Sequence, residues 1–281
     1  MKISKRFKKF RKNFFKIIKK PEMSILPGQL AYSLVLAIIP TITLVTIIAS
    51  VLNLSTDVLS DFLSNAFSSD LANTLLSSSD SFNNDISVLV ILAFGYLIAS
   101  NGASSIIITS NTIYGIKNSN FAKRYIKSSV MILILLFLLI ILLLIPMFGD
   151  IIINLLTENG TNIEIIGNIT FTIKFMQGPI LWIMLFMFIK LIYTMAPDKK
   201  IDTKYVNYGA LFTTFCWVGI TYLYSIYVTE IANYEVLYGQ LANLVILMLW
   251  FYFLSFSFTI GLAFNYHKEE EEKFKELVLN K

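Results

Sequence analysis

Charged residues are scarce in this sequence. Asp, Glu, Lys and Arg together make up 15% of its 281 residues, whereas a soluble domain carries about 25%. Hydrophobic residues make up 56%, and the mean hydropathy is +0.69. This balance excludes an ordinary soluble domain and indicates an all-α polytopic membrane protein. The net charge of +5 does not predict a nucleic-acid partner, because in a membrane protein the placement of charge matters more than its sum.

Cysteine and histidine are nearly absent. The single Cys216 excludes an internal disulfide and any multi-cysteine metal site. The single His267 excludes the two-histidine metal motifs of hydrolases. A Gly-x-Ser-x-Gly motif is also missing, and no histidine in a hydrophobic run could act as a base for a serine. We therefore predict no catalytic residue, no metal site and no cofactor, and expect that the protein is not an enzyme.

Long hydrophobic runs dominate what is present. A membrane-spanning helix needs about 20 mostly apolar residues. Five of the six qualifying runs lack Asp, Glu, Lys and Arg away from their ends, and Lys190 lies one turn from the end of the other. The sequence thus predicts a six-transmembrane-helix bundle over 27–265, with spans at about 27–52, 86–109, 127–148, 177–195, 206–229 and 239–265.

The distribution of Lys and Arg predicts the orientation. Ten precede the first span, four lie in 110–127, three in 196–205 and four in the C-terminal tail over 266–281. The three loops on the other side carry only Lys174. Since positive residues accumulate on the cytoplasmic side, we expect both termini to be cytoplasmic and the protein to lie in the bacterial cytoplasmic membrane.

The segment over 1–26 precedes the first span and is strongly basic. Apolar residues recur every three or four positions, at Ile3, Phe7, Phe10, Phe14 and Ile17. This spacing predicts an amphipathic basic helix on anionic lipid, or else a strong orientation signal with little structure. Pro21 and Pro27 are expected to separate this segment from the first span.

The second hydrophobic run carries polar residues on one helical face, at Asn101, Ser105, Thr109 and Thr112. Small residues at Gly95, Ala99, Gly102 and Ala103 form an adjoining strip, whereas Tyr96, Leu97, Ile107 and Ile108 lie opposite and are expected to face lipid. The small strip predicts a close helix contact. The polar face has two interpretations, hydrogen bonding between helices or one wall of a substrate cavity.

The same two interpretations, helix packing or a substrate cavity, apply to residues of the other spans. Pro40 removes the hydrogen bond to the Leu36 carbonyl and predicts a bend, which is either a simple bend or a device that forms a cavity. Further polar residues in the last spans include Ser255 and Ser257. The candidate substrate path comprises Gln29, Tyr32, Pro40, Asn101, Ser105, Thr109, Thr213 and Asn243.

Charged residues outside the spans have simple interpretations. The Glu run at 269–272 is expected to be a solvated continuation of the last helix, and Asp198 and Asp202 to cap helices. Cations at the predicted inner surface are explained by orientation alone, or they also recruit anionic lipid head groups at about 1 kcal/mol each. The candidate recruiting residues are Lys117, Lys123, Arg124 and Lys127.

Three stretches resemble the YihY/BrkB family of bacterial inner-membrane proteins. They are "LPGQLAYSLVLAIIPTITL", "NTIYGIKNSNFAKRYIKS" and "YEVLYGQLANLVILMLWFYFLSFSFTIGLAFNYH". Tyr238-Gly239 and Leu249-Trp250 match the family pattern, and its closing Gly-Ala-Glu-(Leu/Phe)-Asn segment corresponds to 261–265. Ala263-Phe264 replaces the Ala-Glu pair, so no role for that carboxylate transfers.

The resemblance implies a six-span protein whose family carries the old label ribonuclease BN and whose suggested roles concern the envelope and the export of lipids or solutes. Metal-dependent phosphodiester cleavage needs clustered carboxylates or histidines. The candidates on the predicted inner face have simpler interpretations, Asp198 and Asp202 as helix caps, His267 as an interfacial residue and the Glu run as a solvated helix, so we do not expect ribonuclease activity. Two functions remain: a translocator of an amphiphilic or lipid-linked envelope molecule, or a non-transporting membrane scaffold. A partly open cavity would favour the first, and a filled bundle the second.

Overall fold

The computed structural model describes residues 19, 21–51, 86–158, 163–227 and 240–279. The predicted basic amphipathic helix before the first span lies outside these residues, as does the whole loop over 53–85. In the described chain every regular element is a helix and no β-strand occurs. An all-helical chain suits this composition, since a helix satisfies its backbone hydrogen bonds internally when it meets lipid.

Six helices follow one another in the described parts of the chain. They are α2 (Glu22–Val51), α5 (Ile86–Ile113), α6 (Phe121–Glu158), α7 (Ile163–Met195), α8 (Thr203–Ile226) and α10 (Gln240–Leu279). Five stretches within them are long and apolar enough to cross a membrane: Glu22–Ala49, Phe121–Leu142, Asn168–Met195, Thr203–Ile226 and Leu244–Glu270. The described part of α5, which is rich in Ser, Asn and Thr, is not among these five.

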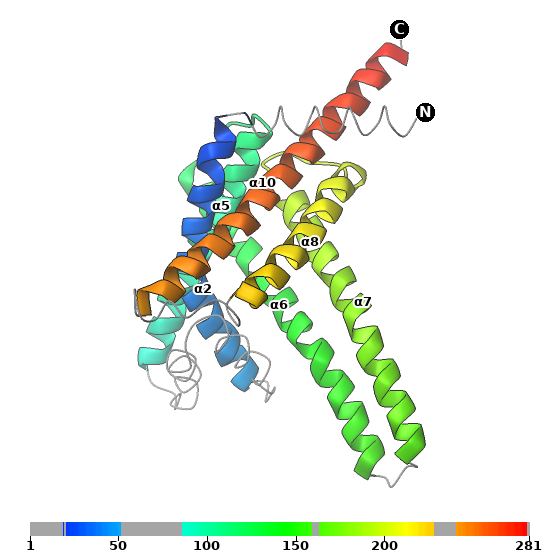
Figure 1. Cartoon of the computed structure of the whole chain (residues 1–281). Coiled ribbons are helices and arrows are strands. Elements are labelled where there is room, and N and C mark those ends of the chain that lie inside the picture. The colour runs from blue at the N-terminus through cyan, green and yellow to red at the C-terminus, as the bar shows by residue number, and fades with distance from the viewer. Residues whose placement is uncertain (1–18, 20, 52–85, 159–162, 228–239, 280–281) are drawn as a thin grey trace.

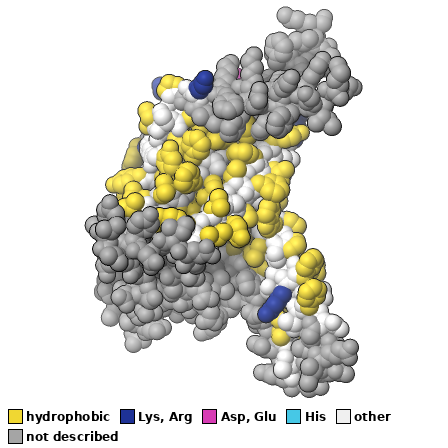
Figure 2. All heavy atoms as spheres, in the orientation of Figure 1, with side chains coloured by type: hydrophobic (Ala, Val, Ile, Leu, Met, Phe, Trp, Pro, Cys, Tyr) yellow, Lys and Arg dark blue, Asp and Glu magenta, His cyan; other side chains and the backbone are white. Residues whose placement is uncertain are grey.

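The helices form a closed ring. Each packs on the next one along the chain, and α10 also packs on α2, so that the first and last helices are neighbours. Figure 1 shows α6 and α7 extending together, as an antiparallel pair, away from the other four helices. Hydrophobic side chains cover much of the described face drawn in Figure 2, with Lys or Arg side chains at its upper edge and another at the lower right.

Helix boundaries differ from the predicted spans mainly in length. The 38 residues of α6 and the 40 of α10 correspond to about 57 and 60 Å, roughly twice the hydrocarbon thickness of a bilayer. Hydrophobicity marks the part of a helix that meets lipid, whereas the helix continues wherever its backbone bonds persist. Pro27 lies inside α2 and does not separate it from an earlier segment, because a proline so near the start removes only the bond to the Met23 carbonyl.

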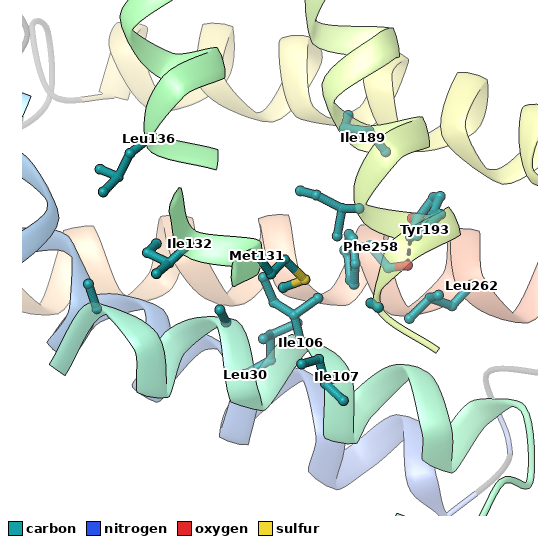
Figure 3. Close-up of a cluster of buried hydrophobic side chains, with 14 of the residues drawn as sticks. Leu30, Ile106, Ile107, Met131, Ile132, Leu136, Ile189, Tyr193, Phe258 and Leu262 are labelled. Carbon is teal, nitrogen blue, oxygen red and sulfur yellow. Dashed lines mark hydrogen bonds between the residues drawn. The ribbon is translucent and has the colours of Figure 1, made fainter. Parts of the chain in front are cut away.

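The core lies where the helices converge. Leu30 of α2, Ile107 of α5, Met131 of α6 and Leu262 of α10 are each at most 1% exposed. Figure 3 shows these side chains pointing toward one another beside Tyr193 of α7. The expectation that Ile107 faces lipid was therefore wrong, since this residue is fully buried. Leu97, on the same predicted face, is 42% exposed, as expected.

The small-residue strip of α5 makes the predicted close contact. A Cβ added at Gly102 would lie 2.7 Å from the Ala37 Cβ of α2, and one at Gly95 would lie 3.6 Å from the Pro40 Cβ. Ala99 and Ala103 are buried between them. Small residues thus let the backbones of α2 and α5 approach, as is usual in membrane bundles.

Candidate functional site

A partly open cavity of about 510 Å³ lies inside the helix ring. Its volume falls in the range of about 300–1,000 Å³ that is typical of ligand pockets. All six helices line it, and one lining residue from each, in chain order, is Ala37, Ala103, Leu136, Phe188, Trp217 and Phe258. The small lining residues come from α2 and α5, at Ala37, Ala99, Gly102 and Ala103, whereas the other four helices contribute mainly Leu, Ile, Phe and Trp.

The cavity has a closed floor and an open mouth. Buried lining residues such as Leu30, Ile132 and Ile192 come from the parts of α2, α6 and α7 nearest the α5–α6 and α7–α8 connections. Half-exposed lining residues such as Leu139 and Leu185 lie farther along α6 and α7, toward the other end. The cavity thus opens away from the end that carries Lys117, Lys123, Lys199 and Lys200, which we call the cationic end.

The cavity walls are almost wholly apolar. Among the described lining residues none is ionisable, and the polar ones are Thr41, Thr221, Ser255 and the two tryptophans. Trp217 Nε1 donates to the Leu254 carbonyl at 3.1 Å, and Trp250 Nε1 to Thr221 Oγ1 at 3.3 Å. Such walls suit a hydrocarbon chain and offer no counter-charge to a phosphate or an amine.

The residues predicted to line a polar path lie elsewhere. Of the seven whose side chains the structure describes, none lines the cavity. Gln29, Tyr32 and Asn101 are exposed on the outer surface of α2 and α5, and Pro40 packs against Gly95. The side chain of Asn243 lies outside the described part of the chain.

The other three predicted path residues, Ser105, Thr109 and Thr213, are buried, and two of them form hydrogen bonds between helices. Ser105 Oγ donates to Ser33 Oγ at 2.7 Å across the α2–α5 contact, and Thr109 is 1% exposed. Thr213 Oγ1 lies 2.6 Å from Tyr193 Oη, which donates to the Phe258 carbonyl at 2.8 Å. These contacts match the interpretation of polar residues as bonds between helices.

A second polar seam joins α5 to α6. Tyr96 Oη donates to the Ser129 carbonyl at 2.7 Å, and Ser100 Oγ lies 3.2 Å from both Ser128 Oγ and Ser129 Oγ. Arg124 Nε donates to Ser104 Oγ at 3.2 Å. The expectation that Tyr96 faces lipid was therefore wrong, because its hydroxyl bonds to α6. The four-residue spacing of Tyr96, Ser100 and Ser104, one position before the Asn101 face, could have revealed this seam.

At the cationic end, Asp198 links α5, α6 and the α7–α8 connection. Its carboxylate accepts hydrogen bonds from Lys127 Nζ at 2.8 Å, Asn111 Nδ2 at 2.8 Å and the Ser119 N–H at 3.3 Å. Its own N–H donates to Asn111 Oδ1 at 2.8 Å. We call these four residues the Asp198 network. Partial burial acts to raise the pKa of Asp198, but the hydrogen bonds and the Lys127 charge outweigh it and lower the pKa to about 2.

The four candidate recruiting cations differ in their surroundings. Lys117 and Lys123 are exposed, whereas Arg124 is half-buried beside Ser104. Lys127 also donates to the Ala196 and Pro197 carbonyls, at 2.7 and 2.8 Å, just beyond the end of α7. With Asp198 as its third acceptor, the Lys127 ammonium uses all three of its N–H groups within the protein.

The Glu run is not wholly solvated as expected. Glu269 is 4% exposed and forms an ion pair of 3.1 Å with Lys199. Lys199 Nζ also lies 5.0 Å from the centre of the Tyr114 ring. Burial and the nearby Glu269 carboxylate raise the pKa of Tyr114. The ion pair joins α10 to the α7–α8 connection, so Glu269 is buried in the bundle and is not exposed to solvent.

The α8–α10 contact explains part of the closing family segment. A Cβ at Gly209 would collide with the Gly261 carbonyl, and Asn265 Oδ1 accepts a hydrogen bond of 2.7 Å from the Gly209 N–H. Phe264, at the Leu/Phe position of that five-residue pattern, packs edge-on against Phe212 with ring centroids 4.9 Å apart. Gly261 and Asn265 thus hold two helices together on the cavity floor side.

No group of three or more His, Cys, Asp or Glu suited to a metal ion occurs in the described residues. The comparison with known families gives a clear result. The sequence profile of the family described as Virulence factor BrkB matches residues 14–278. The chain belongs to this family.

Curated relatives of this BrkB-family chain carry two kinds of name. A Bacillus subtilis protein, YfkH, whose name describes it as ribonuclease-like, is 27% identical over 85% of this chain and 87% of its own length. A UPF0761 membrane protein of Idiomarina loihiensis is 29% identical over 34% of each chain. Another, from Haemophilus influenzae strain 86-028NP, is 35% identical over 21% of this chain and 22% of its own. No solved structure matches the chain.

Proposed function

We propose that this BrkB-family membrane protein translocates an amphiphilic or lipid-linked envelope molecule whose hydrocarbon part occupies the cavity. The observation that carries the proposal is the partly open, apolar cavity of about 510 Å³ at the centre of the ring. A scaffold that only organises partners has no need of such a space, since filling it would stabilise the bundle. Cavities of this kind cost stability in proportion to their volume.

The proposal includes the placement of the protein in the membrane. All six helices cross the bacterial cytoplasmic membrane, and the cationic end faces the cytoplasm, as the distribution of Lys and Arg predicts. The cavity then opens toward the outer half of the bilayer. Anionic lipid head groups gather at the cytoplasmic face around the exposed Lys117 and Lys123, while Lys127 serves the bundle itself.

The proposal also needs a second, inward-open state. In the described state the Asp198 network and the Lys199–Glu269 pair tie the helix ends together below the cavity floor. These are hydrogen bonds and ion pairs, which can exchange with water at a membrane surface, whereas the floor above them is packed hydrocarbon. Alternating access therefore requires that the hydrogen bonds of the Asp198 network and the Lys199–Glu269 ion pair break and re-form.

The test uses the full chain reconstituted in liposomes. Movement of a short-chain fluorescent phosphatidylglycerol between leaflets is followed by its extraction into albumin. Leu139→Trp places a larger side chain in the cavity mouth, and we expect it to slow movement at least tenfold. Leu133→Trp is the matched control, because Leu133 lies on the same helix but is 55% exposed. Equal rates for wild type and Leu139→Trp, with both proteins folded, would reject the cavity as the route.

A further inference from the structure

Ser255 of α10 differs from the other hydroxyl-bearing residues on the cavity wall. It is 1% exposed and lines the cavity, and its Oγ has no hydrogen-bond partner in the described part of the chain. Thr41 Oγ1 donates to the Ala37 carbonyl at 2.6 Å, and Thr221 Oγ1 accepts from the Trp250 indole. A buried hydroxyl without a partner is unfavourable, so a ligand that offers an acceptor here gains an advantage.

The surroundings of Ser255 restrict what that ligand can be. Phe251, Leu254 and Phe258 flank it on α10, and no charged side chain occurs among the described lining residues. A phosphate or an ammonium group at this depth would be buried without a counter-charge, at a cost of many kcal/mol. The group that meets Ser255 is therefore uncharged and is attached directly to hydrocarbon.

Both indole N–H groups of the cavity are already used. Trp217 donates to the Leu254 carbonyl and Trp250 to Thr221. Ser255 is the buried hydroxyl of this wall whose Oγ neither donates nor accepts within the described part of the chain, whereas Thr221 is exposed and already accepts from Trp250. A carbonyl oxygen is the matching acceptor for the Ser255 proton. In acyl lipids this oxygen belongs to the ester that joins the chain to the rest of the molecule.

We propose that the cavity binds the acyl chain of an ester-linked lipid and that Ser255 Oγ donates a hydrogen bond to the ester carbonyl. This rests on the proposed function, since it names the class of molecule that the cavity takes. The apolar walls then contact the hydrocarbon on either side of the ester, and the charged head group stays outside the cavity. An ether-linked lipid of the same length fills the cavity equally well but lacks the acceptor.

The experiment offers the purified full chain an equimolar mixture of ester-linked and ether-linked phosphatidylglycerol with matched chains. The ratio of the two bound forms is read by native mass spectrometry. We expect wild type to prefer the ester about fivefold, which corresponds to about 1 kcal/mol for one neutral hydrogen bond. Ser255→Ala should bind both lipids equally, and Ser255→Cys, a weaker donor of similar size, should show an intermediate ratio.

Two controls separate this inference from the proposed function. Thr41→Val also alters the cavity wall, but that hydroxyl is bonded within α2, so the preference should persist. Leu139→Trp should lower the binding of both lipids. If wild type binds both equally while Leu139→Trp lowers both, or if Ser255→Ala keeps the preference, the role of Ser255 is rejected and the cavity stands. If Leu139→Trp binds both lipids like wild type, the proposed function and this inference fail together.

Discussion

Lys127 and Asp198 form an ion pair of 2.8 Å between α6 and the connection that follows α7. The Lys127 ammonium satisfies two carbonyls at the end of α7 as well. Lys127→Met should therefore lower the free energy of unfolding by about 2–4 kcal/mol, because it leaves the Asp198 carboxylate and both carbonyls without this donor. Thermal unfolding in detergent measures the loss. Lys123→Met, at an exposed cation on the same helix, should change the midpoint by less than about 1 °C, and a similar effect of both would contradict this role of Lys127.

Stability should fall with acidification through the Asp198 network. The pKa of this carboxyl is lowered to about 2 in the folded protein, below its ordinary value near 3.9. Its stabilising contribution is thus fully present above about pH 5 and is lost as the pH falls from about 4 toward 2. Asp198→Asn should be less stable than wild type by roughly 2 kcal/mol at pH 7, about half of this difference should remain near pH 3, and the two should converge as the pH reaches about 2. A difference that is constant from pH 7 to pH 3 would assign the effect to packing.

The close contact between α2 and α5 predicts an effect of a single methyl group. A Cβ at Gly102 would lie 2.7 Å from the Ala37 Cβ, whereas one at Gly219 meets nothing within 4 Å. Gly102→Ala should destabilise the protein by about 1–3 kcal/mol, since an overpacked backbone contact must separate. Gly219→Ala should be neutral or slightly stabilising, as expected for alanine in a helix. Folded yield and thermal midpoint distinguish the two, and equal tolerance would contradict the contact.

The buried Tyr193 hydroxyl predicts a loss when it is removed. It donates to the Phe258 carbonyl and meets Thr213 Oγ1. Tyr193→Phe keeps the ring contact with Phe258 but should cost about 1–2 kcal/mol, because Thr213 then retains only a long bond of 3.4 Å to the Ser257 carbonyl. Tyr222→Phe, on the exposed surface of α8, is the control. Unfolding by denaturant measures both, and a neutral Tyr193→Phe would show that water or a rearranged Thr213 replaces the bond.

Much of the fold could be predicted from the sequence. Apolar runs without internal charge indicate helices in lipid, and the small residues around Gly102 indicate where two helices approach. The extents of α6 and α10 could not be predicted in this way, since hydrophobicity ends at the lipid surface and the helix does not. Burial of Ile107 was also missed, because in a membrane protein apolar residues face both lipid and core.

The candidate site was harder to predict. The search for polar residues selected Asn101 and Thr213, yet the cavity walls consist of Leu, Ile, Phe and Trp, which a sequence does not distinguish from ordinary core. The cavity arises from how all six helices pack together, so no residue pattern within a single helix predicts it. The burial of Glu269 was not predicted for a related reason. Its partner Lys199 is seventy residues away in the sequence, and only the packing of α10 brings the two side chains together.

Because α10 packs between α8 and α2, the wall of the cavity is complete only after this helix, the last of the six described, has been synthesised. A nascent chain that has inserted only through α8 exposes to lipid the faces of α2 and α8 that later meet α10, including Thr213 and Gly209. Such an intermediate carries polar groups whose partners have not yet been synthesised. Premature termination within 240–265 should therefore yield a chain that membrane quality-control proteases recognise and remove. Co-expression of the missing helix as a separate peptide should rescue it.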